Sequence, residues 1–211
     1  KGVTAMAKNP DLLIEKRRDE ILEVFLTLYE KKSLGDINIK TLAEETRFTR
    51  ATIYNYFKNI DEIFICAYQK EYLLWAEDLT QILTKNEKLT QEEFVDKIAG
   101  SLVRRERMLR FSVADFHERE ANCRREFVFS HKLAFTQAIN RMHDCFAKFF
   151  PDKSEEDITK MLYIFFPFMH GMYRYVDLSD VQIEARQAAD MPLKETSIYE
   201  LAYNMIVQIL K

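Results

Sequence analysis

Two side chains that could read DNA bases, Arg50 and Asn55, lie close together in the sequence. A guanidinium can bind guanine through two hydrogen bonds, and an amide can bind adenine in the same way. Ala51 and Tyr54 lie between them and add a methyl group and a phenol. If the stretch is helical, these four side chains share an outward face that could contact a major groove. A solvated polar face on a small helix is the alternative.

Two short helices would position this face. We expect a helix over residues 39–46, capped by Asn38, and a helix over residues 50–57, capped by Thr49, with only Arg47 and Phe48 between the first helix and the second cap. So short a connection is typical of a helix-turn-helix. A first helix over residues 12–32 would complete a three-helix core. The small Ala43 allows close approach, and the apolar residues expected in that core are Leu42, Phe48, Ile53 and Phe57.

Longer helices are expected after this motif. Apolar residues at helical spacing predict six more helices, over residues 61–83, 91–116, 121–150, 154–176, 179–189 and 196–210. No segment shows the convincing two-residue alternation of a strand. The sequence therefore predicts an all-α fold of about nine helices. We expect an N-terminal helix-turn-helix domain over residues 1–58 and a helical effector-binding and dimerisation domain over residues 59–211.

The stretch from Ile39 to Phe64 resembles the DNA-binding signature of the TetR family of transcription factors. The groups that fall on the family's spacing are Leu42-Ala43, Thr49, Thr52-Ile53-Tyr54, Tyr56-Phe57 and Asp61-Glu62-Ile63. The match covers about residues 12–66. The resemblance implies a homodimer that binds a near-palindromic operator in double-stranded DNA. It also implies a repressor that releases the operator when a small molecule binds the C-terminal domain.

The resemblance implies a role for each matching residue. Arg50, Ala51 and Asn55 would face base edges, with the Ala51 methyl group against a thymine methyl group. The residues that would bind phosphate and fix the register are Lys40, Thr49, Thr52, Tyr54 and Tyr56. The basic run at residues 16–18 either reaches the duplex as an arm or is a solvated helix start.

Two positions depart from the family pattern. Arg47 stands in the turn where the family usually has glycine. Either Arg47 adopts a left-handed conformation, at a cost of about 1 kcal/mol, or the turn has a different geometry. Ile60 stands where a phosphate-binding lysine is common. Both departures predict weaker nonspecific affinity for DNA.

Composition excludes several other classes of protein. Four scattered glycines are too few for the phosphate-binding loops of nucleotide-binding folds. The net charge of −3 gives no global attraction to nucleic acid, so DNA contacts must depend on where charges are placed. No apolar run is long enough to cross a membrane, and no secretory-signal pattern is present. We therefore expect a cytoplasmic protein that is not an enzyme and holds no cofactor.

Two apolar helices near the C-terminus predict a dimer seam. Residues 161–176 leave almost no polar face, since only His170 and Arg174 interrupt the apolar side chains. The last helix carries an apolar stripe at spacings of three and four residues. The residues expected at the seam are Met172, Tyr173, Ile198, Leu201, Ala202, Met205, Ile206 and Ile209. A core within one chain is the alternative.

Aromatic residues of the C-terminal half predict an effector site. The candidate lining is Phe111, Phe116, Phe127, Phe135, Phe165 and Met169, with His117, His131 and His170 as polar groups. Pro167 could kink its helix and open space beside this site. Such walls favour a lipid-like, aromatic or drug-like molecule. A plain aromatic core would show the same pattern.

Other functions remain open at this point. The C-terminal domain could be a platform for protein partners, which a buried cavity would argue against. An enzyme would have to use scattered groups such as Asp115, His117, Glu118 and Glu120. No metal site is expected, because the histidine and cysteine pairs lack the spacing of ligands on one helix face. The three cysteines form no disulfide framework.

Overall fold

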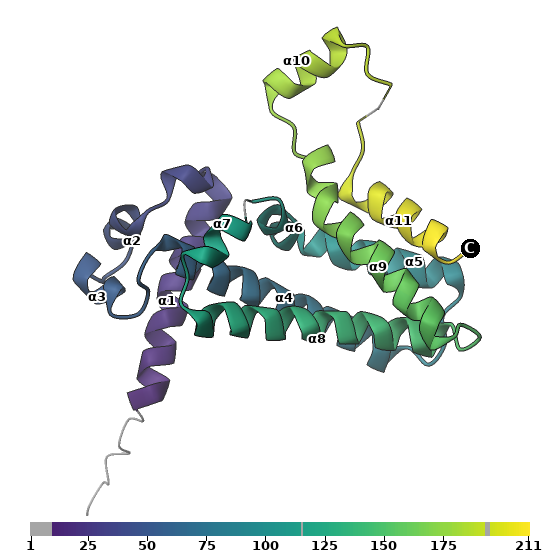
Figure 1. The fold of residues 1–211 in the computed structure, drawn as a ribbon, viewed down its shortest axis with the longest axis horizontal. Helices are drawn as coiled ribbons and strands as arrows, with labels where there is room; N and C mark the ends of the chain where they lie inside the picture. The colour runs from purple at the N-terminus through teal and green to yellow at the C-terminus, as the bar shows by residue number, and fades with distance from the viewer. Residues whose placement is uncertain (1–9, 115, 193–194) are drawn as a thin grey trace, which may run out of the picture. The chain divides into compact units, whose positions relative to one another are not determined.

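Helices make up most of the chain. The computed structural model describes residues 10–114, 116–192 and 195–211, and within these ranges it contains eleven α-helices and no strand (Figure 1). The α-helices are α1 (Pro10–Lys31), α2 (Ile39–Glu45), α3 (Arg50–Tyr54), α4 (Ile60–Lys85), α5 (Gln91–Arg104), α6 (Glu106–Ser112), α7 (Phe116–Ala121), α8 (Arg125–Phe149), α9 (Glu155–Met172), α10 (Asp180–Ala188) and α11 (Ile198–Ile209). Two short 3-10 helices are η1 (Leu34–Asp36) and η2 (Tyr173–Tyr175). The all-α class predicted from the sequence is confirmed.

Side-chain caps define where many of these helices begin. The Asn38 side chain accepts hydrogen bonds from the backbone N–H groups of Lys40 and Thr41. The Thr49 hydroxyl accepts one from the backbone N–H of Thr52. Both caps are those predicted from the sequence. Reciprocal capping boxes begin four later helices, at Thr90, Ser154, Ser179 and Ser197. Each cap satisfies backbone donors that a helix leaves unpaired at its start.

The chain divides into two compact units that do not follow the order of the sequence. The N-terminal unit takes the residues up to Ala67 together with His117–His131. The second unit takes Tyr68–Phe116 and Lys132–Lys211. Helices α4 and α8 each contribute residues to both units. The structure thus places the boundary within α4 and not after residue 58, and it adds a segment from the middle of the chain to the N-terminal unit.

Aromatic and aliphatic side chains form the core of the N-terminal unit. Leu42, Ile53 and Phe57 are fully buried, as predicted, whereas Phe48 is only partly buried. Phe127 of α8 joins this core, with its ring centre 5.9 Å from that of Phe57. The helix-turn-helix therefore packs against a residue that lies far beyond it in the sequence.

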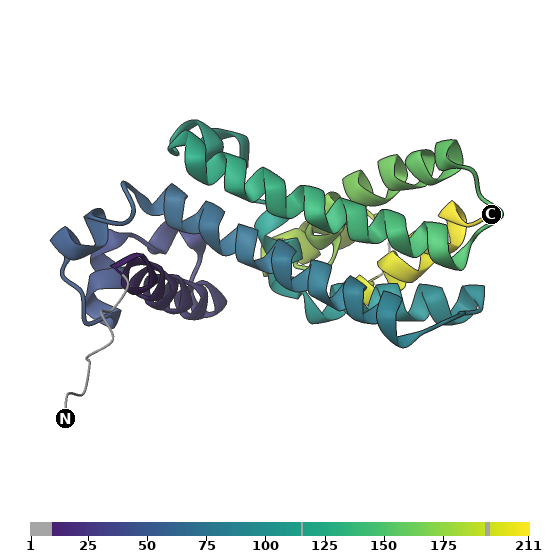
Figure 2. The same ribbon diagram turned by 90° about the horizontal axis from the view of Figure 1, so that it is seen from below.

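The second unit is a helical bundle. Within it α4 and α8 run side by side (Figure 2), and the Lys148 ammonium of α8 donates a hydrogen bond to the Leu83 carbonyl of α4 at 2.7 Å. Helix α11 packs mainly on α5 and also on α9. Trp75 is fully buried in this unit, and its indole N–H donates to the Ser101 hydroxyl at 3.0 Å. Burying that donor without a partner would be costly, so the hydrogen bond fixes the orientation of the ring.

One expected helix is broken into shorter pieces. The stretch 91–116 is interrupted at Arg105, whose backbone angles of φ −110° and ψ 33° are not helical. The Arg105 guanidinium forms two hydrogen bonds to Asp78 of α4, from Nε at 2.7 Å and from Nη2 at 2.9 Å. This long-range ion pair favours the break, because it draws Arg105 towards α4. The structure accordingly has more helices than the sequence predicted.

Candidate DNA-binding site

Thr46 closes the turn between α2 and α3. Its hydroxyl accepts a hydrogen bond from the backbone N–H of Phe48 at 3.2 Å. Arg47, at the tip of the turn, forms an ion pair with Glu20 of α1 at 2.7 Å. Asp190 is the one non-glycine residue with a positive φ in the described part of the chain. Arg47 therefore avoids the left-handed conformation, and of the two alternatives for this position the altered turn is correct.

The four outward residues of the recognition segment are accessible. Arg50, Ala51 and Asn55 are exposed, and Tyr54 is 54% exposed. Ile53, on the opposite face, is fully buried. Helix α3 is shorter than expected, yet Asn55 keeps helical backbone angles of φ −68° and ψ −22° as its C-cap. The side chains suited to bases therefore share one accessible face.

Groups suited to phosphate border this face. The Thr49 and Thr52 hydroxyls lie 3.0 Å apart at the start of α3. Lys40 is exposed, and its Nζ lies 3.9 Å from the Glu44 carboxylate. An exposed ion pair of this kind contributes only about 0–1 kcal/mol, so Lys40 can exchange Glu44 for another anion. Lys40, Glu44 and Thr49 border a surface hollow of about 370 Å³ between α2 and α3.

Two arginines from distant parts of the sequence donate hydrogen bonds to Tyr56. Arg17 of α1 donates a hydrogen bond to the Tyr56 hydroxyl at 3.0 Å. Arg124, just before α8, donates to the Tyr56 carbonyl at 3.0 Å. The guanidinium of Arg18 lies 4.8 Å from the centre of the Phe127 ring. Two of the three residues that could have formed a basic arm are therefore engaged within the unit.

Glu62 of α4 is a fully buried carboxylate with several hydrogen-bond donors around it. Arg124 donates to it from Nε at 2.7 Å and from Nη2 at 2.8 Å, and Lys58 donates from its backbone N–H at 2.6 Å. Burial alone would raise the pKa of Glu62, but these hydrogen bonds outweigh it and hold the pKa below its ordinary value. Glu62 is therefore ionised and fastens α4 to the segment before α8.

A second ion pair lies beside the first. Arg119 of α7 donates to Asp61 at 2.5 Å, and the Asn122 amide donates to the same carboxylate at 3.0 Å. The Asn59 amide donates in turn to the Asn122 carbonyl at 2.8 Å. Sequence reasoning missed Arg119 and Arg124, whose partners stand 58 and 62 residues earlier in the chain. No local pattern signals contacts over such separations.

The residues expected at an effector site do not all gather in one place. Those in the second unit are Phe111, Phe135, Phe165, Met169 and His170. Those in the N-terminal unit are Phe127 and His131. Phe127 is drawn there by its packing on Phe57. The side chains of Phe116 and His117 lie outside what the structure describes. The candidate site is therefore reduced to the group in the second unit.

A hydrogen-bonded chain runs through the aromatic cluster of the second unit. The Tyr68 and Tyr72 hydroxyls lie 2.6 Å apart, and the Tyr72 hydroxyl lies 2.7 Å from Nε2 of His170. Burial lowers the pKa of His170 to about 4 and raises the pKa of Tyr72 well above its ordinary value. The Phe135 ring packs on Tyr72 with ring centres 5.0 Å apart. At neutral pH Tyr72 and His170 are therefore uncharged polar groups between aromatic walls.

Most residues expected at a dimer seam are buried within the chain itself. Helix α11 packs on α5 and α9 of its own chain. The expected seam residues that are buried are Met172, Tyr173, Ile198, Ala202, Met205 and Ile206. Only Leu201 and Ile209 remain partly accessible. The apolar residues exposed on the outer side of α9 are instead Tyr163, Ile164 and Phe168, which sequence reasoning missed. Helix α9 continues through Pro167.

The described residues give no support to metal binding or membrane insertion. Within them, no group of three or more His, Cys, Asp or Glu side chains could hold a metal ion. No helix in this part of the chain has the length and apolar character needed to cross a membrane. The three cysteines are free thiols, and burial raises the pKa of each to about 12. They therefore stay protonated at neutral pH.

The helix-turn-helix with its exposed recognition face, followed by a larger helical unit, defines a helical DNA-binding regulator. Residues 69–210 match the family described as Tetracyclin repressor-like, C-terminal domain. The chain belongs to the TetR family of transcriptional regulators. A transcriptional regulator of the TetR/AcrR family from Thermobifida fusca YX-ER1 is similar in structure, with a TM-score of 0.59 and 16% identity over 92% of this chain and 97% of that one. No curated protein matches the chain.

Proposed function

We propose that the protein is a homodimeric repressor that binds operator DNA through α3 and is released by a small molecule. The observation that carries the proposal is the exposed face of α3, on which Arg50, Ala51 and Asn55 stand together while Ile53 is buried. These side chains suit guanine, a thymine methyl group and adenine respectively. The residues proposed to bind the flanking phosphates are Lys40, Thr49, Thr52, Tyr54 and Tyr56.

A second copy of the chain supplies the other recognition helix. Paired helix-turn-helix units read half-sites about one helical turn apart, so the operator mirrors the two-fold symmetry of the dimer. The outer side of α9 and α11 supports this pairing. An apolar groove of about 330 Å³ runs there, and Ile164, Phe168, Leu201 and Ile209 line it together with three other residues of α11. Apolar patches of this kind mark association surfaces.

The proposed effector is a small molecule with an apolar or aromatic body. The hydrogen-bonded chain from Tyr68 through Tyr72 to His170 supports this proposal, because it offers neutral polar partners between aromatic walls. Helix α8 continues from the second unit into the N-terminal unit, and Arg124 directly precedes it. A shift of α8 would therefore disturb the ion pair of Arg124 with Glu62 and the hydrogen bond from Arg124 to the Tyr56 carbonyl.

Selection of bound sequences from random duplex DNA tests the DNA-binding part of the proposal. A near-palindromic site should be enriched by the full-length dimer, and enrichment of no sequence would overturn the assignment. Metabolites are then screened for release of that site. Because linkage is reciprocal, the operator should weaken effector binding by the same factor, typically about 5- to 150-fold. Equal affinity for free and operator-bound protein would favour a platform for protein partners.

A further inference from the structure

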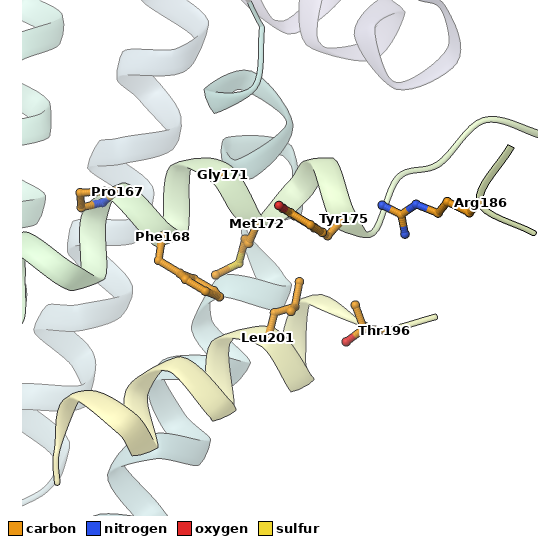
Figure 3. Close-up of a pocket in the computed structure, with 8 residues that line it drawn as sticks. All are labelled: Pro167, Phe168, Gly171, Met172, Tyr175, Arg186, Thr196 and Leu201. Carbon is orange, nitrogen blue, oxygen red and sulfur yellow. The ribbon is translucent and has the colours of Figure 1, made fainter. Parts of the chain in front are cut away.

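Two of the hollows in the surface of the chain differ in their chemistry. One opens on the second unit, where Phe168 of α9 and Leu201 of α11 point into an apolar groove (Figure 3). Both residues also line the groove proposed for a second copy of the chain, so this face belongs to the proposed dimer surface. The other is the hollow of about 370 Å³ between α2 and α3, which is lined mainly by polar and charged side chains. Its chemistry is therefore that of a site for an ionic partner.

Three cationic side chains line the hollow between α2 and α3, namely those of Lys40, Arg47 and Arg50. The proposed function assigns Lys40 to a phosphate and Arg50 to a base edge, so on that proposal the hollow faces the duplex. Arg47 has no role in it. Its guanidinium carbon lies 5.3 Å from the centre of the Phe48 ring, and Phe48 also lines the hollow. The charged end of Arg47 is therefore placed beside this surface.

A carboxylate of α1 neutralises Arg47 in the chain by itself. Nη2 of Arg47 lies 2.7 Å from the Glu20 carboxylate, and no other carboxylate within the described residues forms an ion pair with Arg47. The pair is open to solvent, since 69% of the Arg47 side chain and 34% of the Glu20 side chain are exposed. Water and salt screen a pair of this kind. Arg47 can therefore exchange Glu20 for another anion at little cost.

The cations around the hollow differ in whether they have such a carboxylate. Lys40 has Glu44 at 3.9 Å, one helical turn away, and both side chains are more than half exposed. Arg50, the proposed base-reading cation, forms no ion pair with any residue that the structure describes. Arg47 thus resembles the proposed phosphate-binding Lys40 and not Arg50. A phosphate that binds Arg47 must displace Glu20, just as one that binds Lys40 must displace Glu44.

We propose that Arg47 binds a phosphate of the operator backbone and that Glu20 competes with this phosphate for the guanidinium. This role rests on the proposed function, because it takes the exposed face of α3 as the DNA-binding face. A guanidinium can bind two oxygens of one phosphate, so the exchange replaces one charge-assisted pair with another. Glu20 thereby lowers the affinity for every duplex by the same factor, since a phosphate contact does not depend on sequence. The competing role for the pair is to anchor the turn before α3 to α1.

Fluorescence anisotropy of the full-length protein with a labelled duplex of mixed sequence tests the phosphate contact. A duplex of about 30 base pairs spans two half-sites one helical turn apart. Arg47→Gln should weaken binding about three- to tenfold, because a charge-assisted contact is lost. It should also lower the slope of log K against log salt concentration by about 0.9 for each subunit, since one phosphate fewer is neutralised. Arg47→Lys should keep the slope, and an unchanged slope for Arg47→Gln would overturn the proposal.

Glu20→Gln tests the competition, and its expected effect has the opposite sign. Because it leaves Arg47 without a carboxylate partner, binding of the same duplex should tighten about three- to fivefold, which corresponds to the strength of an exposed ion pair. Asp19→Asn is the control and should change the affinity less than about twofold, since the exposed Asp19 forms no ion pair with Arg47 in the described part of the chain. In an Arg47→Gln background, Glu20→Gln should have no further effect, which a double-mutant cycle measures. If Glu20→Gln weakened binding as Arg47→Gln does, the pair would anchor the turn and the competition would be excluded.

Sequence preference separates a failure of this role from a failure of the proposed function. If the parent protein enriches a near-palindromic site while the Arg47 and Glu20 variants bind like the parent, only the role of Arg47 fails. A parent protein that bound no duplex would overturn both. None of the substituted side chains is buried, so circular dichroism should show the same helix content for every variant.

Discussion

Arg124 and Glu62 are joined by two parallel hydrogen bonds, from Nε to Oε1 at 2.7 Å and from Nη2 to Oε2 at 2.8 Å, although 62 residues separate them. The same guanidinium lies 4.7 Å from the centre of the Phe127 ring. Bidentate pairs of this kind combine charge with fixed geometry. The pair fastens a segment from the middle of the chain to the first turn of α4, which follows the helix-turn-helix.

We expect Arg124→Gln to lower the free energy of unfolding by about 2–3 kcal/mol. Removing one partner of a buried pair costs about 3–5 kcal/mol, and the partial exposure of Arg124 reduces that figure. Urea denaturation measures the loss. Arg125→Gln, at an exposed position next to it, should stay within about 0.5 kcal/mol of the parent protein. Equal losses of unfolding free energy for the two variants would show that the Arg124–Glu62 ion pair does not stabilise the fold.

Substitutions on α3 should separate base contacts from phosphate contacts. Arg50→Ala and Asn55→Ala should each weaken operator binding by about 1–3 kcal/mol and barely change binding to a scrambled duplex. Tyr54→Phe should weaken both, since a phosphate contact does not depend on sequence. Fluorescence anisotropy with the two duplexes measures this difference. If Arg50→Ala weakened all duplexes alike, Arg50 would not be a base-reading residue.

A charge on the outer side of α9 should separate the subunits without unfolding them. Ile164 is 55% exposed in the single chain, so Ile164→Asp should leave the helical circular dichroism intact while sedimentation shows a monomer. Leu133→Asp, at a position of α8 that is 71% exposed, is the control and should remain dimeric. Ala202→Asp should unfold the chain, because Ala202 is fully buried within it. A dimeric Ile164→Asp protein would exclude this surface.

His170 should make stability depend on pH in a defined interval. Burial lowers its pKa in the folded protein from 6.5 to about 4, so the unfolded chain binds a proton more readily. The contribution of neutral His170 is therefore complete above about pH 6.5 and is lost as the pH falls towards 4. Denaturation at several pH values measures the slope. His170→Gln should flatten it, and an unchanged slope would assign the dependence to other groups.

Local signals made the recognition segment predictable from the sequence. Asn38 and Thr49 cap α2 and α3 through contacts two or three residues away, so their roles could be read directly from sequence spacing. The break at Arg105 has no such signal, because neither glycine nor proline marks it and its partner is Asp78 on another helix. The place of Arg124 likewise depends on a residue far back in the chain.

The apolar stripe of α11, which the sequence predicted to lie at a dimer seam, shows another limit of sequence patterns. An apolar spacing of three and four residues identifies a buried face, but it does not tell whether that face packs within one chain or between two. Ala202 and Ile206 are fully buried against their own chain, whereas Ile164 and Phe168 face outwards. Only the packing of α11 on α5 and α9 distinguishes these sets.

The inclusion of residues 117–131 in the N-terminal unit has a consequence for protein synthesis. Chains emerge from the ribosome N-terminus first, and domains generally fold in that order. Here Glu62 and Phe57 are synthesised before Arg124 and Phe127, so the contacts of the buried carboxylate and of the Phe57 ring form only after the later residues have emerged. A prematurely terminated chain can carry the whole recognition motif and still lack these partners. We therefore expect the recognition motif of such a fragment to be less stable than in the full chain, because the buried Glu62 carboxylate would lack Arg124.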